Sequence, residues 1–181
     1  MTYRFTVDPA EEMLILTTKE GKPIGTATRK ECHTGEGKTH WGFLAMVKRS
    51  NETIILAKRS RRKSVFANVW DGSVASHVLP GDTPESAAHR ETKEELGIDV
   101  SYQRIGDFFY TTKDGDHAEN EFCSLLLGKS AQSVTPLPTE VSAVKNVPYE
   151  ELYKQIKMFS KKYSPWLKIA LKRYGSTIES F

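Results

Sequence analysis

The chain has 181 residues, the length of one compact domain with a sizeable core, and a second full domain is not expected. Its apolar content is 38% and its charged content is 27%. No apolar run approaches the roughly 18 residues of a membrane span, so we expect a soluble protein that does not enter a membrane. A net charge of +3 indicates no particular class of partner.

The N-terminus and the cysteines both indicate a cytoplasmic protein. Acidic residues precede the first apolar stretch, and the basic, apolar and small-residue succession of a secretory signal is absent. Cys32 and Cys123 are the only cysteines, and they do not form a Cys-x-x-Cys pair. Two isolated cysteines suit a reducing compartment in which both stay free thiols.

Alternating or β-branched apolar runs predict five strands, at residues 13–17, 41–47, 53–57, 121–127 and 141–147. A helix is predicted over residues 84–96, with Thr83 as its N-cap, Pro84 at its first position and Gly97 at its end. Apolar residues three or four apart predict further helices at residues 149–158 and 165–173. This order predicts a mixed sheet covered by helices, an α/β or α+β sandwich.

The basic residues cluster at residues 58–64, with the sequence KRSRRKS. Such a run suits nucleic acid, a small phosphorylated ligand or simple solvation. No stripe of interleaved aromatic residues accompanies it, so nucleic-acid binding is not expected.

The predicted helix at residues 84–96 carries three glutamates on one face. Glu91, Glu94 and Glu95 are three and four residues apart, and their like charges repel at this spacing. A Mg²⁺ ion would relieve the repulsion and leave coordination positions open for a phosphate. Arg90 stands four residues before Glu94 and is suited to orient the cluster. The alternative is a solvated acidic face, paired with Arg90 and Lys93.

The surrounding segment, GDTPESAAHRETKEELGI, resembles the Nudix box. The residues that match its pattern in place are Arg90, Glu91, Glu94, Glu95, Gly97 and Ile98. Two positions depart from it, because Ser76 replaces the first Gly and Asp82 replaces the first Glu. The resemblance implies a Nudix α/β/α sandwich whose central acidic helix presents metal-binding glutamates to a diphosphate.

A second constellation contains three histidines and two glutamates. His33 and His40 are seven residues apart, His77 follows a further predicted strand at residues 73–75, and Glu119 and Glu121 flank one asparagine. Each residue alone is more often a solvated or satisfied polar group than a ligand. Together they could form one metal site, for which imidazoles with carboxylates suit Mn²⁺ or Zn²⁺ as well as Mg²⁺.

This constellation resembles the site of type 1 isopentenyl diphosphate isomerases, which belong to the Nudix superfamily. The likeness runs from about residue 21 to residue 173 and implies five metal ligands, with His77 in the loop before the central helix. It implies that Arg59 and Lys63 hold a diphosphate and that Glu95 helps bind a bridging Mg²⁺. It also implies that Trp166 closes the hydrocarbon end of a pocket, although Trp166 suits a core equally, and that Tyr110 is catalytic.

The resemblance breaks at the acid-base pair that isomerisation needs. The isomerases carry a cysteine two positions before the third histidine, where this chain has Ala75. Neither Cys32 nor Cys123 can be assigned to that position. Isomerases also commonly keep only part of the glutamate set, which is complete here. We therefore expect first a metal-dependent hydrolase of a small organic diphosphate, second an isopentenyl diphosphate isomerase, and third a non-catalytic binding protein, with the oligomeric state left open.

Overall fold

The computed structural model describes residues 8–49 and 52–181, so residues 1–7 and 50–51 of the predicted single domain lie outside the described residues. Within the described part, one mixed sheet of nine strands forms the centre of the protein. Its strands are β1 (Met13–Thr17), β2 (Pro23–Thr28), β3 (His40–Lys48), β4 (Thr53–Arg59), β5 (Trp70–Asp71), β6 (Val74–His77), β7 (Tyr102–Asp114), β8 (His117–Lys129) and β9 (Val141–Pro148). All five predicted strands and the mixed sheet are confirmed.

Strand β3 lies in the middle of the sheet. It pairs in parallel with β8 along its whole length and antiparallel with β6. Its sequence is apolar at most positions, as expected of a strand that is buried on both faces. Leu44 and Met46 belong to one hydrophobic cluster, and Phe43, Ala45 and Val47 belong to another. The strand therefore separates two cores.

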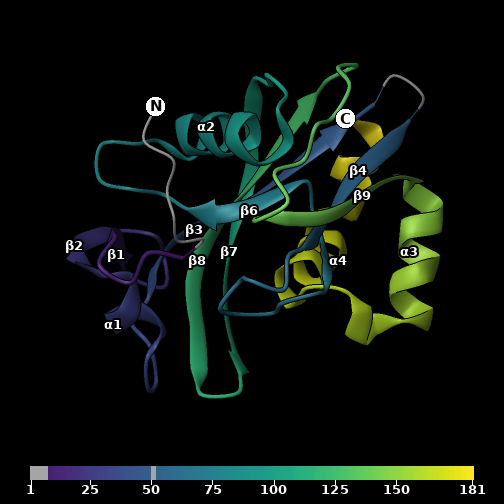
Figure 1. The fold of residues 1–181 in the computed structure, drawn as a ribbon. Helices are drawn as coiled ribbons and strands as arrows, with labels where there is room; N and C mark the ends of the chain where they lie inside the picture. Colours follow the sequence, from purple (N-terminus) through teal and green to yellow (C-terminus); the bar gives the residue numbers. More distant parts are fainter. Residues whose placement is uncertain (1–7, 50–51) are drawn as a thin grey trace.

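Helices cover both faces of this sheet. Helix α2 (Pro84–Leu96) buries Ala87 in the cluster that contains Phe43 and Ala45 of β3. Helix α4 (Pro165–Ser180) buries Leu167 in the cluster on the other face. Figure 1 shows α2 and α4 on opposite sides of the sheet, with α3 (Tyr149–Met158) beside β9 at its edge. The predicted α/β/α sandwich is confirmed.

The ends of α2 follow the residues that predicted them. The Thr83 hydroxyl accepts a hydrogen bond from the Ser86 N–H at 3.2 Å, and the Ser86 hydroxyl accepts one from the Thr83 N–H at 2.9 Å. This reciprocal cap satisfies two N–H groups at the helix start. Pro84 occupies the first turn, and Gly97 ends the helix with a φ of +69°, a left-handed conformation that glycine adopts without strain.

Several parts of the fold differ from the predicted elements. The apolar pattern missed β2, β5, β7 and the short helix α1 (Arg29–His33), and α4 continues beyond residue 173 to Ser180. Strand β7 is half exposed and has a register shift between Arg104 and Gly106, so no regular alternation marks it. A Cβ at Gly106 would lie 2.6 Å from the Tyr174 ring, which explains the glycine at this position.

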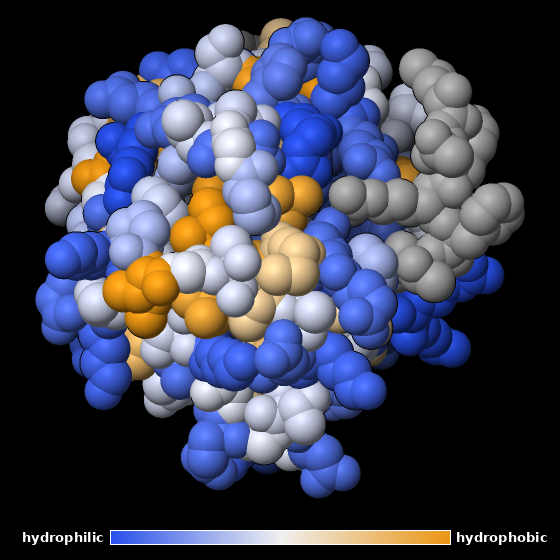
Figure 2. Space-filling model, turned by 90° about the vertical axis from the view of Figure 1, so that its left-hand side faces the viewer, coloured by the Kyte–Doolittle hydropathy of each residue, from blue (hydrophilic) through white to orange (hydrophobic). Residues whose placement is uncertain are grey.

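The face around β1 and β2 is largely hydrophilic, with a small apolar region near its centre (Figure 2). Met13 and Ile24, which lie on these two strands, are 42% and 62% exposed. Scattered exposed apolar residues of this kind are normal on a globular protein. Among the helices of the described residues, none is both long enough and apolar enough to cross a membrane.

Candidate active site

Helix α1 and strand β3 hold the first two histidines. The Thr28 hydroxyl accepts a hydrogen bond from the Glu31 N–H, and the Glu31 carboxylate accepts one from the Thr28 N–H. This reciprocal cap defines the start of a helix of five residues whose last residue is His33. His40 begins β3, and its pairing with Glu121 of β8 places both residues at the same level of the sheet.

The third histidine joins them from β6. His77 is the last residue of this strand and pairs with Gly42 of β3, so the prediction that placed it in a loop was wrong by one residue. The ring centroids of His33 and His40 lie 4.7 Å apart, and those of His77 lie 5.2 and 4.9 Å from them. The sheet therefore brings together three buried imidazoles from three separate elements.

Backbone carbonyls determine which nitrogen of two of these rings carries the proton. His33 Nδ1 lies 2.7 Å from the Arg29 carbonyl oxygen, and His40 Nδ1 lies 2.8 Å from the Lys38 carbonyl oxygen. A carbonyl oxygen only accepts hydrogen bonds, so each Nδ1 must donate. In the neutral ring, Nε2 then keeps its lone pair, which is the form that binds a metal.

Glu119 and Glu121 lie on β8 and face these Nε2 atoms. Glu119 Oε1 lies 3.6 Å from His33 Nε2. Glu121 Oε1 lies 3.5 Å from His40 Nε2 and 3.3 Å from His77 Nε2. Residues two apart on a strand point to the same face, so both carboxylates approach the histidines from one side.

This donor set fits a divalent cation. Ligand atoms in each of two overlapping groups lie within 4.8 Å of one another, and together the groups contain His33, His40, His77, Glu119 and Glu121. His40 Nε2 is buried and has no hydrogen-bond partner among the described residues. Burial, together with the Arg29 charge, lowers the pKa of His77 well below its usual value, which keeps this imidazole neutral. Neutral imidazoles beside carboxylates suit Mn²⁺, Zn²⁺ or Mg²⁺.

Tyr110 adds a proton donor to the cluster. It pairs with Glu121 across β7 and β8, and its hydroxyl donates a hydrogen bond to Glu121 Oε2 at 2.7 Å. Burial and the Glu121 charge raise the pKa of Tyr110 well above its usual value. Burial opposes ionisation of Glu121, but the His40 and His77 rings lower its pKa below its usual range. At neutral pH the site therefore contains a carboxylate and a protonated phenol.

Gly42 lies close to the Glu121 carboxylate, and a Cβ there would approach Oε2 to 2.4 Å. The carboxylate can rotate away, so we expect Gly42→Ala to fold but to turn Glu121 from His40 and His77. Affinity for Mn²⁺ should fall by at least about tenfold, as happens when a metal ligand is misoriented. Isothermal titration with Mn²⁺ measures the change, and circular dichroism checks the fold. Unchanged affinity in a folded variant would contradict this arrangement.

A cleft of about 950 Å³ opens beside the histidine cluster. Glu91, Glu94 and Glu95 of α2 line it, and so do Arg59 and Lys63. Glu91 and Glu95 are buried, whereas Glu94 is exposed. The two constellations that are separate in the sequence therefore share one cleft.

Arg90 binds the start of the acidic helix. It forms ion pairs with Glu91 and, at 2.8 Å, with Asp82, instead of the pair with Glu94 that its spacing allowed. Asp82 replaces the first Glu of the Nudix pattern, and its carboxylate contacts this arginine. Ser76, which replaces the first Gly, lies within β6 and lines the cleft. The serine at this position therefore does not interrupt the strand.

Lys63 lies between a buried carboxylate, Glu95, and a half-buried one, Glu140. Its Nζ lies 3.5 Å from Glu95 Oε1 and forms an ion pair with Glu140. Burial raises the pKa of Glu95 to about 7, although the Lys63 charge opposes this rise. Glu140 also lines the cleft, but sequence reasoning missed it because it precedes β9 without any recognisable pattern.

Arg59 and Trp166 form a second part of the cleft lining. The Arg59 guanidinium lies over the Trp166 ring, 5.3 Å from its centroid. Phe66 and Tyr110 pack near the same ring, at centroid distances of 5.3 and 6.0 Å. The sequence left open whether Trp166 belongs to a pocket or to the core. It belongs to both, because it is 4% exposed and lines the cleft.

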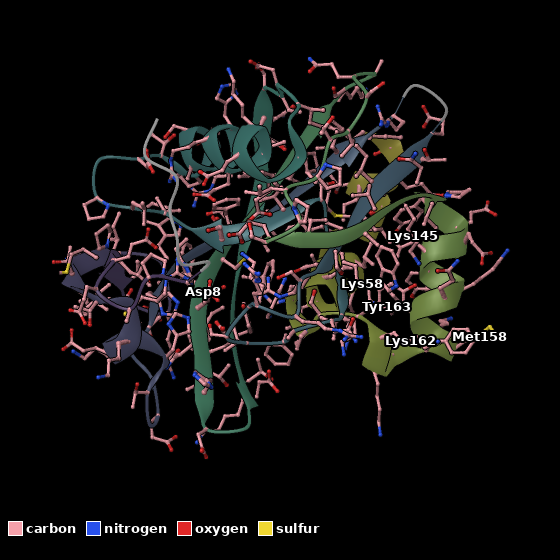
Figure 3. The ribbon with its side chains drawn as sticks, viewed as in Figure 1. Asp8, Lys58, Lys145, Met158, Lys162 and Tyr163 are labelled. Atoms are coloured by element: carbon pink, nitrogen blue, oxygen red, sulfur yellow. The ribbon has the colours of Figure 1, made fainter. Side chains whose placement is uncertain are left out.

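Arg29 and Asp8 are cleft residues that the sequence did not indicate. Asp8 accepts a hydrogen bond from the Ser64 N–H at 2.7 Å and lies 3.4 Å from Arg29. Burial opposes ionisation of Asp8, but Lys63, Ser64 and Arg29 lower its pKa to about 2. Figure 3 shows Asp8 on the α1 side of the molecule, far from α3. A single acid and a single arginine form no motif, so only the fold reveals them.

Ala75 lies on β6 where an isomerase carries its cysteine. It lines the cleft and packs against the cluster that contains Tyr110 and Trp166. Cys32 and Cys123 are both buried, and neither lines the cleft. Burial raises the pKa of Cys32 to about 11 and that of Cys123 well above its usual value. The described lining of the cleft therefore includes no thiol.

The NUDIX domain model matches residues 38–167 of the chain. A protein of Haloarcula marismortui named isopentenyl-diphosphate Delta-isomerase is 34% identical over 180 residues, which covers 93% of this chain and 94% of that protein. A protein of Brevibacterium linens with the same name is 30% identical and covers 86% of this chain and 87% of its own length.

Solved structures share the fold. The crystal structure of DR0079 from Deinococcus radiodurans superposes with a TM-score of 0.72 at 22% identity, over 90% of this chain and 99% of that one. The family model spans more than half of the chain, and the sequence relatives span nearly all of it. The chain therefore belongs to the NUDIX domain family, and its relatives over most of its length are named isopentenyl-diphosphate Delta-isomerases.

Proposed function

We propose that the protein is a metal-dependent hydrolase of a small organic diphosphate. The observation that supports this most is the complete set Glu91, Glu94 and Glu95 lining the same cleft as Arg59 and Lys63. Carboxylates suit Mg²⁺, and the two cations suit phosphate oxygens. A diphosphate in this cleft would meet both kinds of group at once.

A divalent cation held by these glutamates supplies stabilisation of charge on phosphoryl oxygens and acidifies a water molecule. Arg59 would bind phosphate oxygens through the N–H groups that its protein partners leave free, and Lys63 would add a point charge. Glu94 is exposed and has no ion pair in the described part of the chain, so it is the glutamate best placed to accept the proton of the attacking water. The water oxygen bonds to phosphorus as the P–O bond to the leaving group breaks.

The apolar part of the cleft favours a substrate that carries a hydrocarbon group. Trp166 lines the cleft together with Phe43, Val65 and Leu137. These side chains offer no hydrogen-bond acceptors, and pockets of this kind gain affinity from burying apolar ligand surface. We therefore propose a prenyl-type diphosphate ester in preference to a nucleotide.

Isomerisation of isopentenyl diphosphate is the second candidate. It is favoured by the Tyr110 hydrogen bond to Glu121, which places a proton donor beside a carboxylate, and by the names of the sequence relatives. The reaction also needs a second acid or base across the substrate. Ala75 supplies no such group, and for this reason hydrolysis ranks first.

Nuclear magnetic resonance distinguishes the candidates in one tube. The protein is incubated with isopentenyl diphosphate, Mg²⁺ and Mn²⁺ in D₂O, and proton and phosphorus spectra are followed together. We expect phosphate release from an unchanged carbon skeleton. Deuterium in the skeleton, or dimethylallyl diphosphate, would instead establish isomerisation. Binding of the ester without any turnover would leave a non-catalytic binding protein.

Restoring the thiol is a test of the second candidate. If the scaffold retains the isomerase arrangement, Ala75→Cys should raise deuterium incorporation by about 10²-fold or more, the usual contribution of a positioned acid or base. The matched control is Ala75→Ser, which has nearly the same size and a far weaker acid. No gain in a folded Ala75→Cys protein would count heavily against isomerisation on this scaffold.

A further inference from the structure

Asp71 is a buried acid behind the wall of the cleft. It ends the short strand β5 and is 3% exposed. It is absent from the residues that line the large cleft, whereas Arg59 and Trp166 both belong to that lining. Asp71 therefore has no direct contact with a ligand in the cleft, and it can orient a ligand only through other side chains.

The two oxygens of this carboxylate have different partners. Oδ1 accepts hydrogen bonds at 2.7 Å from the Trp166 indole N–H, the Ser164 hydroxyl and the Gly72 backbone N–H. Oδ2 faces Arg59, whose Nη1 lies 3.4 Å away. One oxygen therefore anchors the start of α4, and the other anchors the end of β4.

These contacts close a triangle, because the Arg59 guanidinium also lies over the Trp166 ring at 5.3 Å. Arg59 is held further by the carbonyl oxygens of Val65 and Phe66, to which its Nε and Nη2 donate. Tyr163, which immediately precedes Ser164, is shown in Figure 3 at the junction between α3 and α4. A buried carboxylate with this many partners fixes the orientation of each of them.

We propose that Asp71 is a positioning residue that ties the diphosphate-binding Arg59 to the hydrocarbon-facing Trp166. This proposal rests on the proposed function, because Arg59 and Trp166 are assigned there to the two ends of a substrate. Asp71 makes the two ends of the cleft one rigid unit. Turnover depends on its Oδ2, and selectivity for the hydrocarbon group depends on its Oδ1.

Two variants separate these roles. Asp71→Asn keeps an oxygen where three donors converge and replaces Oδ2 with an amide N–H₂ that cannot accept from Arg59. Asp71→Ala removes both acceptors. If Asp71→Ala does not fold, Trp166→Phe takes its place, because it keeps an aromatic ring and removes the indole N–H together with the five-membered ring that carries it.

The chain contains a matched control outside the cleft. Asp107 accepts hydrogen bonds from Arg104 and Ser124, and Arg104 lies over the Trp41 ring at 5.6 Å. Ser124 in turn accepts a hydrogen bond from the Trp41 indole N–H. None of these four residues lines the cleft. Arg104 and Ser124 both contact Oδ1 of Asp107, so Asp107→Asn does not separate two oxygens as Asp71→Asn does. It removes a carboxylate charge beside an arginine at a place where this should not affect a substrate.

The probes are methyl diphosphate and isopentenyl diphosphate, which share one head group and differ in the hydrocarbon part. Their affinity ratio cancels the effect of removing a negative charge near Arg59. We expect Asp71→Ala to lower the preference for isopentenyl diphosphate over methyl diphosphate about tenfold. Asp71→Asn should preserve this preference, and Asp107→Asn should change neither affinity. Asp71→Asn should lower kcat for hydrolysis about tenfold. If it instead tightens both esters and leaves kcat unchanged, Asp71 only neutralises Arg59 and the proposal is wrong.

A signal independent of any ligand keeps this test separate from the proposed function. The three tryptophans each give an indole N–H signal in a ¹⁵N spectrum, and the signal that disappears in Trp166→Phe belongs to Trp166. This signal should shift far more in Asp71→Ala than in Asp71→Asn, because Asp71→Asn keeps an oxygen that accepts from the indole N–H. A wild-type protein that binds neither ester would refute the proposed function, and the indole signal would then decide the anchoring role alone. An unmoved signal in Asp71→Ala would refute that role.

Discussion

Glu94→Gln and Glu95→Gln should each reduce phosphate release from a diphosphate ester by at least about 10²-fold, the lower end of what a positioned acid or base contributes. Glutamine keeps the size of the side chain but removes the charge that holds Mg²⁺ and accepts a proton. Glu95 is buried beside Lys63, and Glu94 is the exposed member of the set. Initial rates of phosphate release in saturating Mg²⁺ measure the loss.

Glu85→Gln is the matched control for this pair. Glu85 lies in the first turn of the same helix and does not line the cleft. It should keep wild-type activity, which shows that loss of one helix charge is not itself harmful. Full activity in both Glu94→Gln and Glu95→Gln would mean that the acidic helix does not carry the chemistry.

The second large effect is expected at the histidine cluster. His40→Ala should lower affinity for Mn²⁺ or Zn²⁺ at this site by about 10²-fold or more, at or above the upper end of the loss usual for groups that only orient a ligand. His40 is fully buried and its Nε2 has no hydrogen-bond partner in the described part of the chain, so His40→Ala removes a nitrogen that is not otherwise engaged. Isothermal titration with each metal measures the change.

His117→Ala serves as the control, because His117 lies at the exposed start of β8 and outside the cleft lining. It should bind metal as the wild type does. The phosphate-release rate of His40→Ala then reports on cooperation between the two sites. Hydrolysis that survives the loss of this metal would show that the acidic helix acts alone.

The sequence predicted helix α2 to the residue because its signals are local. A capping threonine, a proline in the first turn and a glycine at the end each act within one turn of chain. The three histidines and two glutamates were indicated by spacing, and the structure places them in one cluster. Their roles as ligands remain predictions.

Other features were not predictable, because they arise from contacts between distant segments. Asp71 precedes a glycine, a pair typical of a turn, and nothing nearby distinguishes a buried carboxylate that contacts Trp166. Glu140 and Lys63 are far apart in the sequence, and the pairing of β4 with β9 brings them together. Strand β7 shows no clean alternation, because a register shift between Arg104 and Gly106 interrupts its pairing with β8.

The parallel pairing of β3 with β8 also has a consequence for how the chain folds. His40 and Glu121 meet only across this pairing, which joins segments from the first and second halves of the sequence. Such long-range closure is entropically costly and slow, and it comes late in comparison with local helix formation. A partly folded chain that lacks β8 presents none of the carboxylates of the cluster. The appearance of metal affinity during refolding would therefore mark completion of the sheet, and the cation would act as a probe of the last folding step.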